Sequence, residues 1–174
     1  MSESNKGKFQ WPIVGHSNIV SYLQNSLNGA GLAHAYLLVG PNNIGKTTVA
    51  THFVNSLVCK ELDKDHQQVP CGTCQCCVQV SSHVHPDIFW LKRELNEKTG
   101  KLKKNISIDQ VRRLQGQLSS SSFMNTYKVA VISEAQTLSI EAANSLLKTL
   151  EEPTNKTVLI LLASSLANIP QTVM

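Results

Sequence analysis

Nine consecutive residues, 40–48, have the composition and spacing of a loop that binds a polyphosphate. They read GPNNIGKTT and therefore fit the pattern G-x-x-x-x-G-K-[ST]. Glycines at 40 and 45 let the backbone turn so that its N–H groups face phosphate oxygens. Lys46 is expected to reach the β- and γ-phosphates, and the Thr47 hydroxyl to bind Mg²⁺. The predicted site for ATP and Mg²⁺ consists of Gly40, Pro41, Asn42, Asn43, Ile44, Gly45, Lys46, Thr47 and Thr48.

The segments on either side of this loop support a binding site. Residues 35–39 form an apolar run that is typical of a buried strand, and residues 46–58 carry apolar side chains at helical spacing. A helix that begins at the loop adds the positive end of its dipole to the site. A glycine-rich turn without a ligand is the alternative, and the strand–loop–helix context favours nucleotide binding over it.

A second element that nucleotide hydrolysis requires is incomplete. A carboxylate at the end of another strand usually holds Mg²⁺, and here the apolar run 128–132 leads into Ser133 and Glu134. Ser133 offers only a neutral hydroxyl, so Mg²⁺ is expected to be held weakly. Glu134 is the candidate catalytic carboxylate, with the alternative that it only caps or flanks the next helix. We therefore expect ATP binding with weak or no hydrolysis.

Four cysteines have the spacing of a structural zinc site. Cys59, Cys71, Cys74 and Cys77 form C-x11-C-x2-C-x2-C, in which two short steps bring thiolates to one point and a distant fourth completes a tetrahedron. Four thiolates fill the coordination shell, so the predicted Zn²⁺ has no catalytic role. The alternative is a group of buried, reduced cysteines without a metal. Other candidate ligands are Cys76, His66, His83 and His85.

The composition is that of a globular protein. The 174 residues are 41% apolar and 16% charged, and this length suits one domain with its own core. The net charge of +4 permits contact with nucleic acid without arguing for it. The longest apolar run, 157–163, is too short to span a membrane, and the polar start of the chain lacks the core of a signal peptide. The sequence therefore predicts a cytoplasmic protein with reduced thiols and no membrane contact.

Strands and helices are predicted to alternate along the chain. Further helices are expected at 17–27, 107–118 and 139–150, and further strands at 86–91, 128–132 and 158–163. This alternation predicts an α/β fold with a parallel sheet covered on both faces. Ser107 or Asp109 is expected to cap the helix that begins there. Residues 1–11 are expected to be a disordered tail, and 92–105 a solvated loop or hairpin, with a DNA-binding patch as the alternative.

Several motifs together make the chain similar to a known family. They are HAYLL at 34–38, PCGTC at 70–74, HPD at 85–87, ISEAQTL at 132–138 and AANSLLKTLEEP at 142–153. On these residues the chain resembles, over about 14–173, the clamp-loader subunits of bacterial DNA polymerase III. The resemblance implies the AAA+ form of the P-loop NTPase fold. It also implies a RecA-like, three-layer core over 12–174 with a small zinc module inserted at 59–77.

The resemblance also implies a function and partners. Such subunits bind ATP and help place a sliding clamp on primed DNA during replication, together with the other clamp-loader subunits in a hetero-oligomer. Ser133 in place of an aspartate makes the chain more similar to the delta-prime type, whereas the intact loop 40–48 is more similar to the gamma/tau motor type. We take the delta-prime type as the expectation and an active gamma/tau-type ATPase as the alternative. A metabolic kinase with a phosphate-binding loop would leave residues 142–153 unexplained.

Family members continue beyond the equivalent of Met174 into Ser-Arg-Cys, a helical lid and a collar for oligomerisation. The resemblance therefore implies that these 174 residues are an N-terminal fragment from which the lid and collar are absent. Ser164 and Ser165 stand where the family places a polar side chain that senses the γ-phosphate.

Overall fold

The computed structural model describes residues 11–27, 31–60, 70–124 and 126–169. Within them the chain forms two compact units, each made of two segments. The helical unit comprises the described residues up to 33 together with 47–85, and the sheet unit comprises 34–46 together with those from 86 onward. None of the helices in the described part of the chain is long and apolar enough to cross a membrane.

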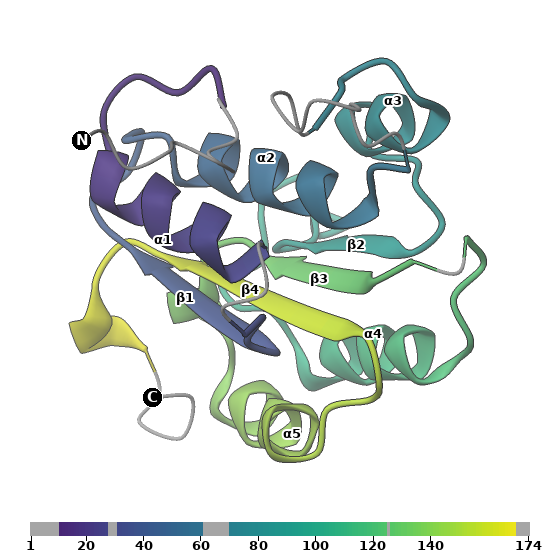
Figure 1. Ribbon diagram of the computed structural model, residues 1–174. Helices are drawn as coiled ribbons and strands as arrows, with labels where there is room; N and C mark the ends of the chain where they lie inside the picture. The colour runs from purple at the N-terminus through teal and green to yellow at the C-terminus, as the bar shows by residue number, and fades with distance from the viewer. Residues whose placement is uncertain (1–10, 28–30, 61–69, 125, 170–174) are drawn as a thin grey trace, which may run out of the picture. The chain divides into compact units, whose positions relative to one another are not determined.

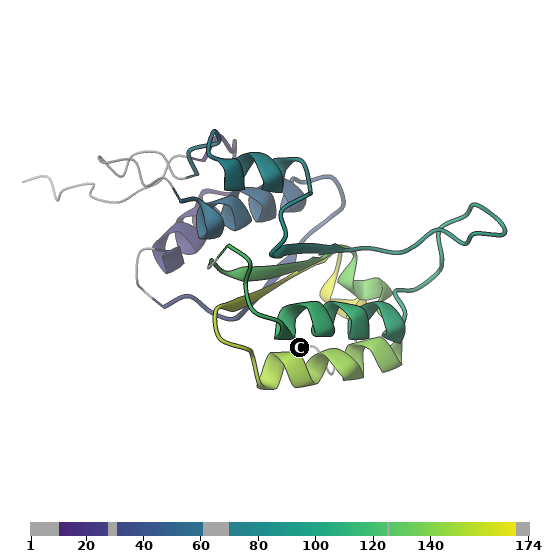
Figure 2. The same cartoon turned by 90° about the vertical axis from the view of Figure 1, so that its right-hand side faces the viewer.

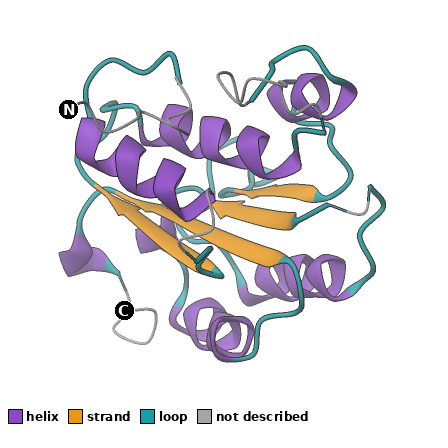
Figure 3. Cartoon of the chain, viewed as in Figure 1, coloured by secondary structure: helices purple, strands orange, loops and turns teal. Residues whose placement is uncertain are grey.

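The sheet unit contains a four-stranded parallel sheet with the strand order β1-β4-β3-β2 (Figures 1 and 3). The strands are β1 (Ala35–Val39), β2 (Ile88–Leu91), β3 (Lys128–Ile132) and β4 (Thr157–Ala163). The inner strands β3 and β4 are buried at every position, and both are nearly continuous apolar runs, the pattern of buried parallel strands. Because all strands point the same way, the residues that follow them lie at one edge of the sheet.

Two helices of the sheet unit, α4 (Ile108–Ser119) and α5 (Ile140–Glu151), pack against each other (Figures 1 and 2). Apolar side chains three or four residues apart on each helix form one stripe. These stripes share a buried core cluster with side chains of β3 and β4. The cluster includes Val111, Leu114, Leu118, Ala143, Leu146, Ala130, Ile132, Leu159 and Leu161.

Each of these two helices begins at a serine whose hydroxyl accepts from an N–H group of the first turn, where the helix itself supplies no carbonyl acceptor. The Ser107 hydroxyl accepts from the Gln110 N–H at 3.4 Å, and the Gln110 side chain accepts from the Ser107 N–H at 3.1 Å, which completes a capping box. The Ser139 hydroxyl accepts from the Ala142 N–H at 3.2 Å at the start of α5. Of the two caps that the sequence left open for α4, Ser107 is therefore confirmed.

The helical unit contains α1 (Ser17–Leu27), α3 (Gln75–Ser81) and all but the first residue of α2 (Lys46–Val58). Trp11 precedes α1 and is only 6% exposed. Its ring stacks on His52 with centroids 6.1 Å apart, and its Nε1–H donates to the Ser56 hydroxyl at 3.2 Å. The prediction of a disordered tail is therefore wrong at Trp11, because two residues of α2 anchor the indole. Residues 1–10 lie outside the described part of the chain.

The other predicted helices and strands are confirmed with small shifts at their ends, and α3 was not predicted. The strand expected at 86–91 begins only at Ile88. Pro86 has no N–H to donate to a neighbouring strand. Asp87 is fully buried, and its carboxylate accepts from the Ser122 hydroxyl and from the N–H groups of Phe123 and Met124 at 2.8 to 2.9 Å. Asp87 thus fastens the loop before β3 to the start of β2.

Candidate nucleotide and metal sites

The loop after β1 has the backbone geometry that its glycines predict. Gly45 has a φ of +92° and Asn43 a φ of +63°, so the chain reverses within three residues. A Cβ added to Gly40 would lie 2.5 Å from the end of the Ile44 side chain, which would have to shift, so the turn brings residues 40 and 44 close together. The Gly40 N–H donates to the Ala163 carbonyl at 3.1 Å, which ties the loop to the end of β4.

Lys46 lies over the loop that precedes it. Its ammonium donates to the carbonyls of Gly40 and Pro41, both at 2.6 Å. An ammonium has three donors and no acceptor, and here two of its donors bind neutral carbonyls. The charged oxygens of a polyphosphate can replace these carbonyls as acceptors. Thr47 and Thr48 of the predicted site are exposed in the first turn of α2. A tight glycine turn, a cation and a helix start fit a polyphosphate, and its binding by residues 40–48 stays a prediction.

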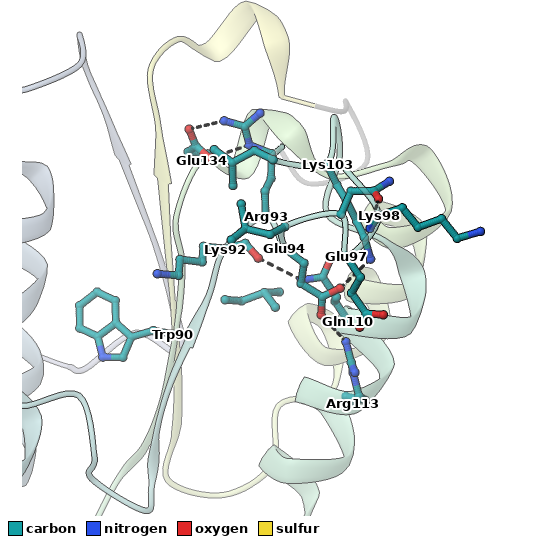
Figure 4. A pocket seen from close by; sticks show the side chains of 14 residues that line it. Trp90, Lys92, Arg93, Glu94, Glu97, Lys98, Lys103, Gln110, Arg113 and Glu134 are labelled. Carbon is teal, nitrogen blue, oxygen red and sulfur yellow. Dashed lines mark hydrogen bonds and ion pairs between the residues drawn. The ribbon is translucent and has the colours of Figure 1, made fainter. Parts of the chain in front are cut away.

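The candidate catalytic carboxylate is held by an arginine. Glu134 lies two residues after the end of β3 with a left-handed φ of +58°, and Arg93 lies two residues after the end of β2. Their side chains form a two-bond ion pair, Nε to Oε2 at 2.8 Å and a terminal guanidinium nitrogen to Oε1 at 3.0 Å (Figure 4). The hydrogen bonds and charge of Glu134 raise the pKa of Arg93 above its ordinary value. Both oxygens of the carboxylate are thereby engaged.

Ser133 supplies no replacement for a metal-binding acid. Its N–H donates to the Leu91 carbonyl at 2.9 Å and so extends the pairing of β3 with β2. Glu134 stands just before the short 3₁₀ helix η1 (Ala135–Thr137), and its side chain does not cap it. Glu134 therefore flanks that helix and its carboxylate binds Arg93, whereas its catalytic role stays a prediction.

The residues proposed as γ-phosphate sensors lie at the end of β4. The Ser164 N–H donates to the Gln136 side-chain oxygen at 3.3 Å, which connects the end of β4 to η1. The Ser165 hydroxyl accepts from the Ala167 N–H at 3.2 Å and so caps the 3₁₀ helix η2 (Leu166–Asn168). Ser165 is thus engaged locally, and the sensor role stays a prediction.

A wide pocket of about 1360 Å³ opens beside the ion pair (Figure 4). Residues that follow β2 line it, together with Gln110 and Arg113 of α4 and with Glu134. No residue of the loop 40–48 contributes to its wall. Glu94 in its wall binds both Lys103, at 2.8 Å, and Arg113, at 2.6 Å. Their hydrogen bonds and charges hold the pKa of Glu94 below its ordinary value, chiefly through Lys103.

The four predicted cysteines come together in the helical unit. Cys59 follows α2, Cys71 and Cys74 lie before α3, and Cys77 lies in its first turn. Their sulfur atoms all lie within 4.8 Å of one another. Tetrahedral Zn²⁺ with Zn–S bonds of about 2.3 Å places sulfurs about 3.8 Å apart. The Cys71 and Cys77 sulfurs are already 4.0 Å apart, so the group can hold a metal ion after a small contraction.

The local environment of these thiols differs. Burial would raise the pKa of Cys71, but hydrogen bonds from the N–H groups of Cys74 and Thr73 hold it at about 6. Burial raises the pKa of the Cys77 thiol. A thiolate is the form that binds Zn²⁺. Backbone donors therefore favour the thiolate of Cys71, whereas Cys77 would release its proton to water only as a metal ion binds.

The alternative ligands fall outside this group. Cys76 is buried beside Cys77 and does not belong to the four-sulfur cluster. His83 is exposed and His85 buried, and neither joins the cluster. His66 lies outside the described residues.

Comparison with known proteins places the chain in a family. The family described as "DNA polymerase III, delta subunit" matches residues 15–174. The delta-prime subunit of Pseudomonas aeruginosa is 39% identical over 131 residues, which are 75% of this chain and 37% of that protein. The tau subunit of Bacillus subtilis is 32% identical over 161 residues, 92% of this chain and 26% of that protein. The chain thus spans between about a quarter and two fifths of these relatives.

A solved structure shows the same fold. The gamma subunit-related protein of Thermotoga maritima superposes with a TM-score of 0.54 at 18% identity, over 87% of this chain and 42% of that one. The expected α/β class, a P-loop fold of the AAA+ type with a parallel sheet, is confirmed. The relatives carry the names of delta-prime, tau and gamma subunits, so the subunit type stays open. The chain belongs to the DNA polymerase III delta-subunit family.

Proposed function

We propose that this chain is the nucleotide-binding part of a clamp-loader subunit of the delta-prime type. It binds ATP with Mg²⁺ at residues 40–48 and helps to load a sliding clamp on primed DNA during replication. The observation that carries this proposal is the loop after β1, where Gly40 closes a tight turn and Lys46 stands over it, in a member of a polymerase III family.

Hydrolysis is weak or absent in this proposal. Efficient hydrolysis needs an acid on Mg²⁺ and a free carboxylate that orients the attacking water. Ser133 carries no charge, and Arg93 occupies both oxygens of Glu134. Nucleotide binding does not depend on either group, since the loop supplies backbone N–H groups and an ammonium. Bound ATP therefore remains in the site without being hydrolysed.

An active gamma/tau-type ATPase is the second candidate. The complete loop 40–48 favours it, and so do relatives named tau and gamma subunits. Under this alternative, Glu134 leaves Arg93 when nucleotide binds and another acid holds Mg²⁺.

The four cysteines are proposed to hold one structural Zn²⁺ within residues 59–77. The fit of the sulfur distances to a tetrahedral site supports this metal. The ion would cross-link the end of α2 to the start of α3 and would leave no position for a substrate.

The proposed partners are the other clamp-loader subunits, the sliding clamp and primer-template DNA, in the cytoplasm. The names of the relatives, which are subunits of one polymerase, support a hetero-oligomer. The helical lid and collar expected from the resemblance are proposed as parts of the complete subunit.

Nucleotide binding is tested with a fluorescent ATP analogue and Lys46→Ala. Charge-assisted hydrogen bonds contribute about 1.5 to 3 kcal/mol each, so affinity should fall about 10- to 150-fold. Lys148→Ala, an exposed lysine on α5, is the matched control and should bind as the unaltered chain does. If both variants bind the ATP analogue with equal affinity, the loop 40–48 is excluded as the nucleotide-binding site. Rapid steady-state hydrolysis that Glu134→Gln abolishes would favour the gamma/tau type.

A further inference from the structure

A hairpin projects from the sheet unit between β2 and α4 (Figure 2). We call residues 92–105 the basic hairpin. Leu95 and Leu102 form an antiparallel bridge across it. The Asn96 N–H donates to the Lys101 carbonyl and the Lys103 N–H to the Glu94 carbonyl, both at 2.8 Å. The hairpin thus has a defined, two-stranded base.

The tip of the basic hairpin is fixed by its own hydrogen bonds. The Asn96 side-chain oxygen accepts from the N–H groups of Lys98 at 2.9 Å and Thr99 at 3.2 Å. Gly100 has a φ of +66°, and its N–H donates to the Asn96 carbonyl at 2.8 Å. Glycine adopts this conformation without strain because it has no Cβ. The lysines are therefore presented from an ordered turn, which lowers the entropy that a ligand must remove.

The basic hairpin holds the whole net charge of the chain. It carries six basic and two acidic side chains. Because the chain has 16 basic and 12 acidic residues in total, the remainder is balanced with ten of each. Glu94 is already bound by Lys103 and Arg113. In the described part of the chain, Lys98, Lys101 and Lys104 are exposed and pair with no carboxylate.

Two apolar side chains accompany this charge. Leu95 and Leu102 are 61% and 56% exposed, and as opposite members of a bridge they project from the same face of the ribbon. No aromatic residue lies in the basic hairpin. Binding of single strands depends largely on aromatic side chains that stack on bases. Because the basic hairpin lacks such side chains, a duplex, whose regularly spaced negative charge can be bound without stacking on bases, fits it better than a single strand does.

We propose that the basic hairpin binds the sugar–phosphate backbone of duplex DNA without reading its sequence. Duplex DNA carries a negative charge about every 1.7 Å along its axis, and its major groove is wide enough for a two-stranded ribbon. Lys98, Lys101 and Lys104 contact phosphates, and the two leucines contact the groove. Asn96, a residue type that can read adenine, is engaged in the turn. This inference rests on the proposed function and gives it a DNA contact in this chain.

The test is a salt titration of binding to a fluorescent duplex of random sequence, without nucleotide. Each lost phosphate contact lowers the slope of log affinity against log salt by about 0.9. The variant Lys98→Gln/Lys101→Gln should therefore lose about 1.8 in slope and bind about 10- to 60-fold more weakly near 0.1 M salt. The variant Leu95→Ala/Leu102→Ala should bind more weakly with the slope unchanged.

The matched control is Lys148→Gln/Lys156→Gln, which removes the same charge. Lys156 directly precedes β4, and Lys148 lies in the last turn of α5. A hydrogen bond from His34 to the Leu150 carbonyl shows that this end of α5 lies near the start of β1. Both lie at the edge where strands begin, whereas the basic hairpin follows the end of β2. The control should keep the slope and affinity of the unaltered chain.

Three outcomes would overturn the proposal. They are undetectable duplex binding at 50 mM salt, equal losses in the hairpin and control variants, or a polyglutamate peptide that binds the hairpin in preference to DNA. The last would make the partner an acidic protein segment. Nucleotide affinity, measured in parallel, should be the same in the hairpin variants and in the unaltered chain. Loss of DNA binding is thereby separated from failure of the proposed nucleotide site.

Discussion

Replacing Lys128 with methionine tests how a buried cation stabilises the sheet unit. Lys128 begins β3, the strand that leads to Ser133 and Glu134, and it is only 4% exposed. Its ammonium donates to the Gln117 carbonyl in the last turn of α4 at 2.5 Å and to the Ser120 hydroxyl at 2.6 Å. It also lies 5.9 Å from the centre of the Phe89 ring. The cation therefore neutralises the negative end of α4 and joins that helix to β3.

The expected cost follows from these contacts. Two hydrogen bonds from a charged donor contribute about 1.5 to 3 kcal/mol each, but burial of the ammonium opposes them. Methionine keeps most of the stem and its packing, and water can reach the exposed Gln117 and Ser120 after the substitution. We therefore expect Lys128→Met to lower the free energy of unfolding by about 2 kcal/mol. Lys128→Ala should cost about 1 to 2 kcal/mol more, because it also leaves a cavity.

The measurement is urea unfolding followed by circular dichroism. The slope m should be the same in all variants, since the surface exposed on unfolding changes little. Lys156→Met, at an exposed lysine, is the control and should change stability by less than about 0.5 kcal/mol. If Lys128→Met is as stable as the unaltered chain, the hydrogen bonds only compensate for desolvation, and the buried cation gives the sheet unit no net stability.

Three further predictions concern the metal, the hydrolysis and the pH. Cys71→Ser should lower the zinc content from one ion per chain by elemental analysis, and full retention would exclude the proposed site. Ser133→Asp combined with Arg93→Gln should raise ATP hydrolysis at least about tenfold, because Mg²⁺ gains an acid and Glu134 is released; an unchanged rate would contradict this. Burial lowers the pKa of His52 from 6.5, so the folded state binds fewer protons than the unfolded state just below that pH. Stability should therefore fall as pH is lowered from 7 toward 5, and His52→Phe should flatten that dependence.

The parts that the sequence predicted are those with local signals. The apolar runs 128–132 and 157–163 marked the inner strands, and Ser107 was one of the two caps expected for α4. The C-x2-C-x2-C spacing brings its thiols together almost by itself, because it spans one turn and the start of α3. In each case, the interacting residues are neighbours in sequence, so propensity and spacing are sufficient.

The parts that it did not predict depend on distant partners. Arg93 and Glu134 are 41 residues apart, and only the pairing of β2 with β3 brings them together. Trp11 looked like part of a polar tail because its partners on α2 lie about 40 residues later. The start of β2 was placed too early because the apolar pattern does not show that the Asp87 carboxylate is engaged by a loop 35 residues away. A charge or an aromatic ring alone gives no indication of such a partner.

Binding and hydrolysis depend on different parts of this molecule. In the proposed nucleotide site, the groups that would bind phosphate are mostly backbone N–H groups, whose directions are set by the turn at Asn43 and Gly45 and do not change with the side chains after β3. Hydrolysis would depend on carboxylates after β3, where Ser133 has none and Glu134 is paired with Arg93. One capacity can therefore be lost while the other persists. Because the Arg93–Glu134 pair is partly exposed, water can compete with it. Whether it opens when nucleotide binds would distinguish the proposed delta-prime-type subunit from a gamma/tau-type motor.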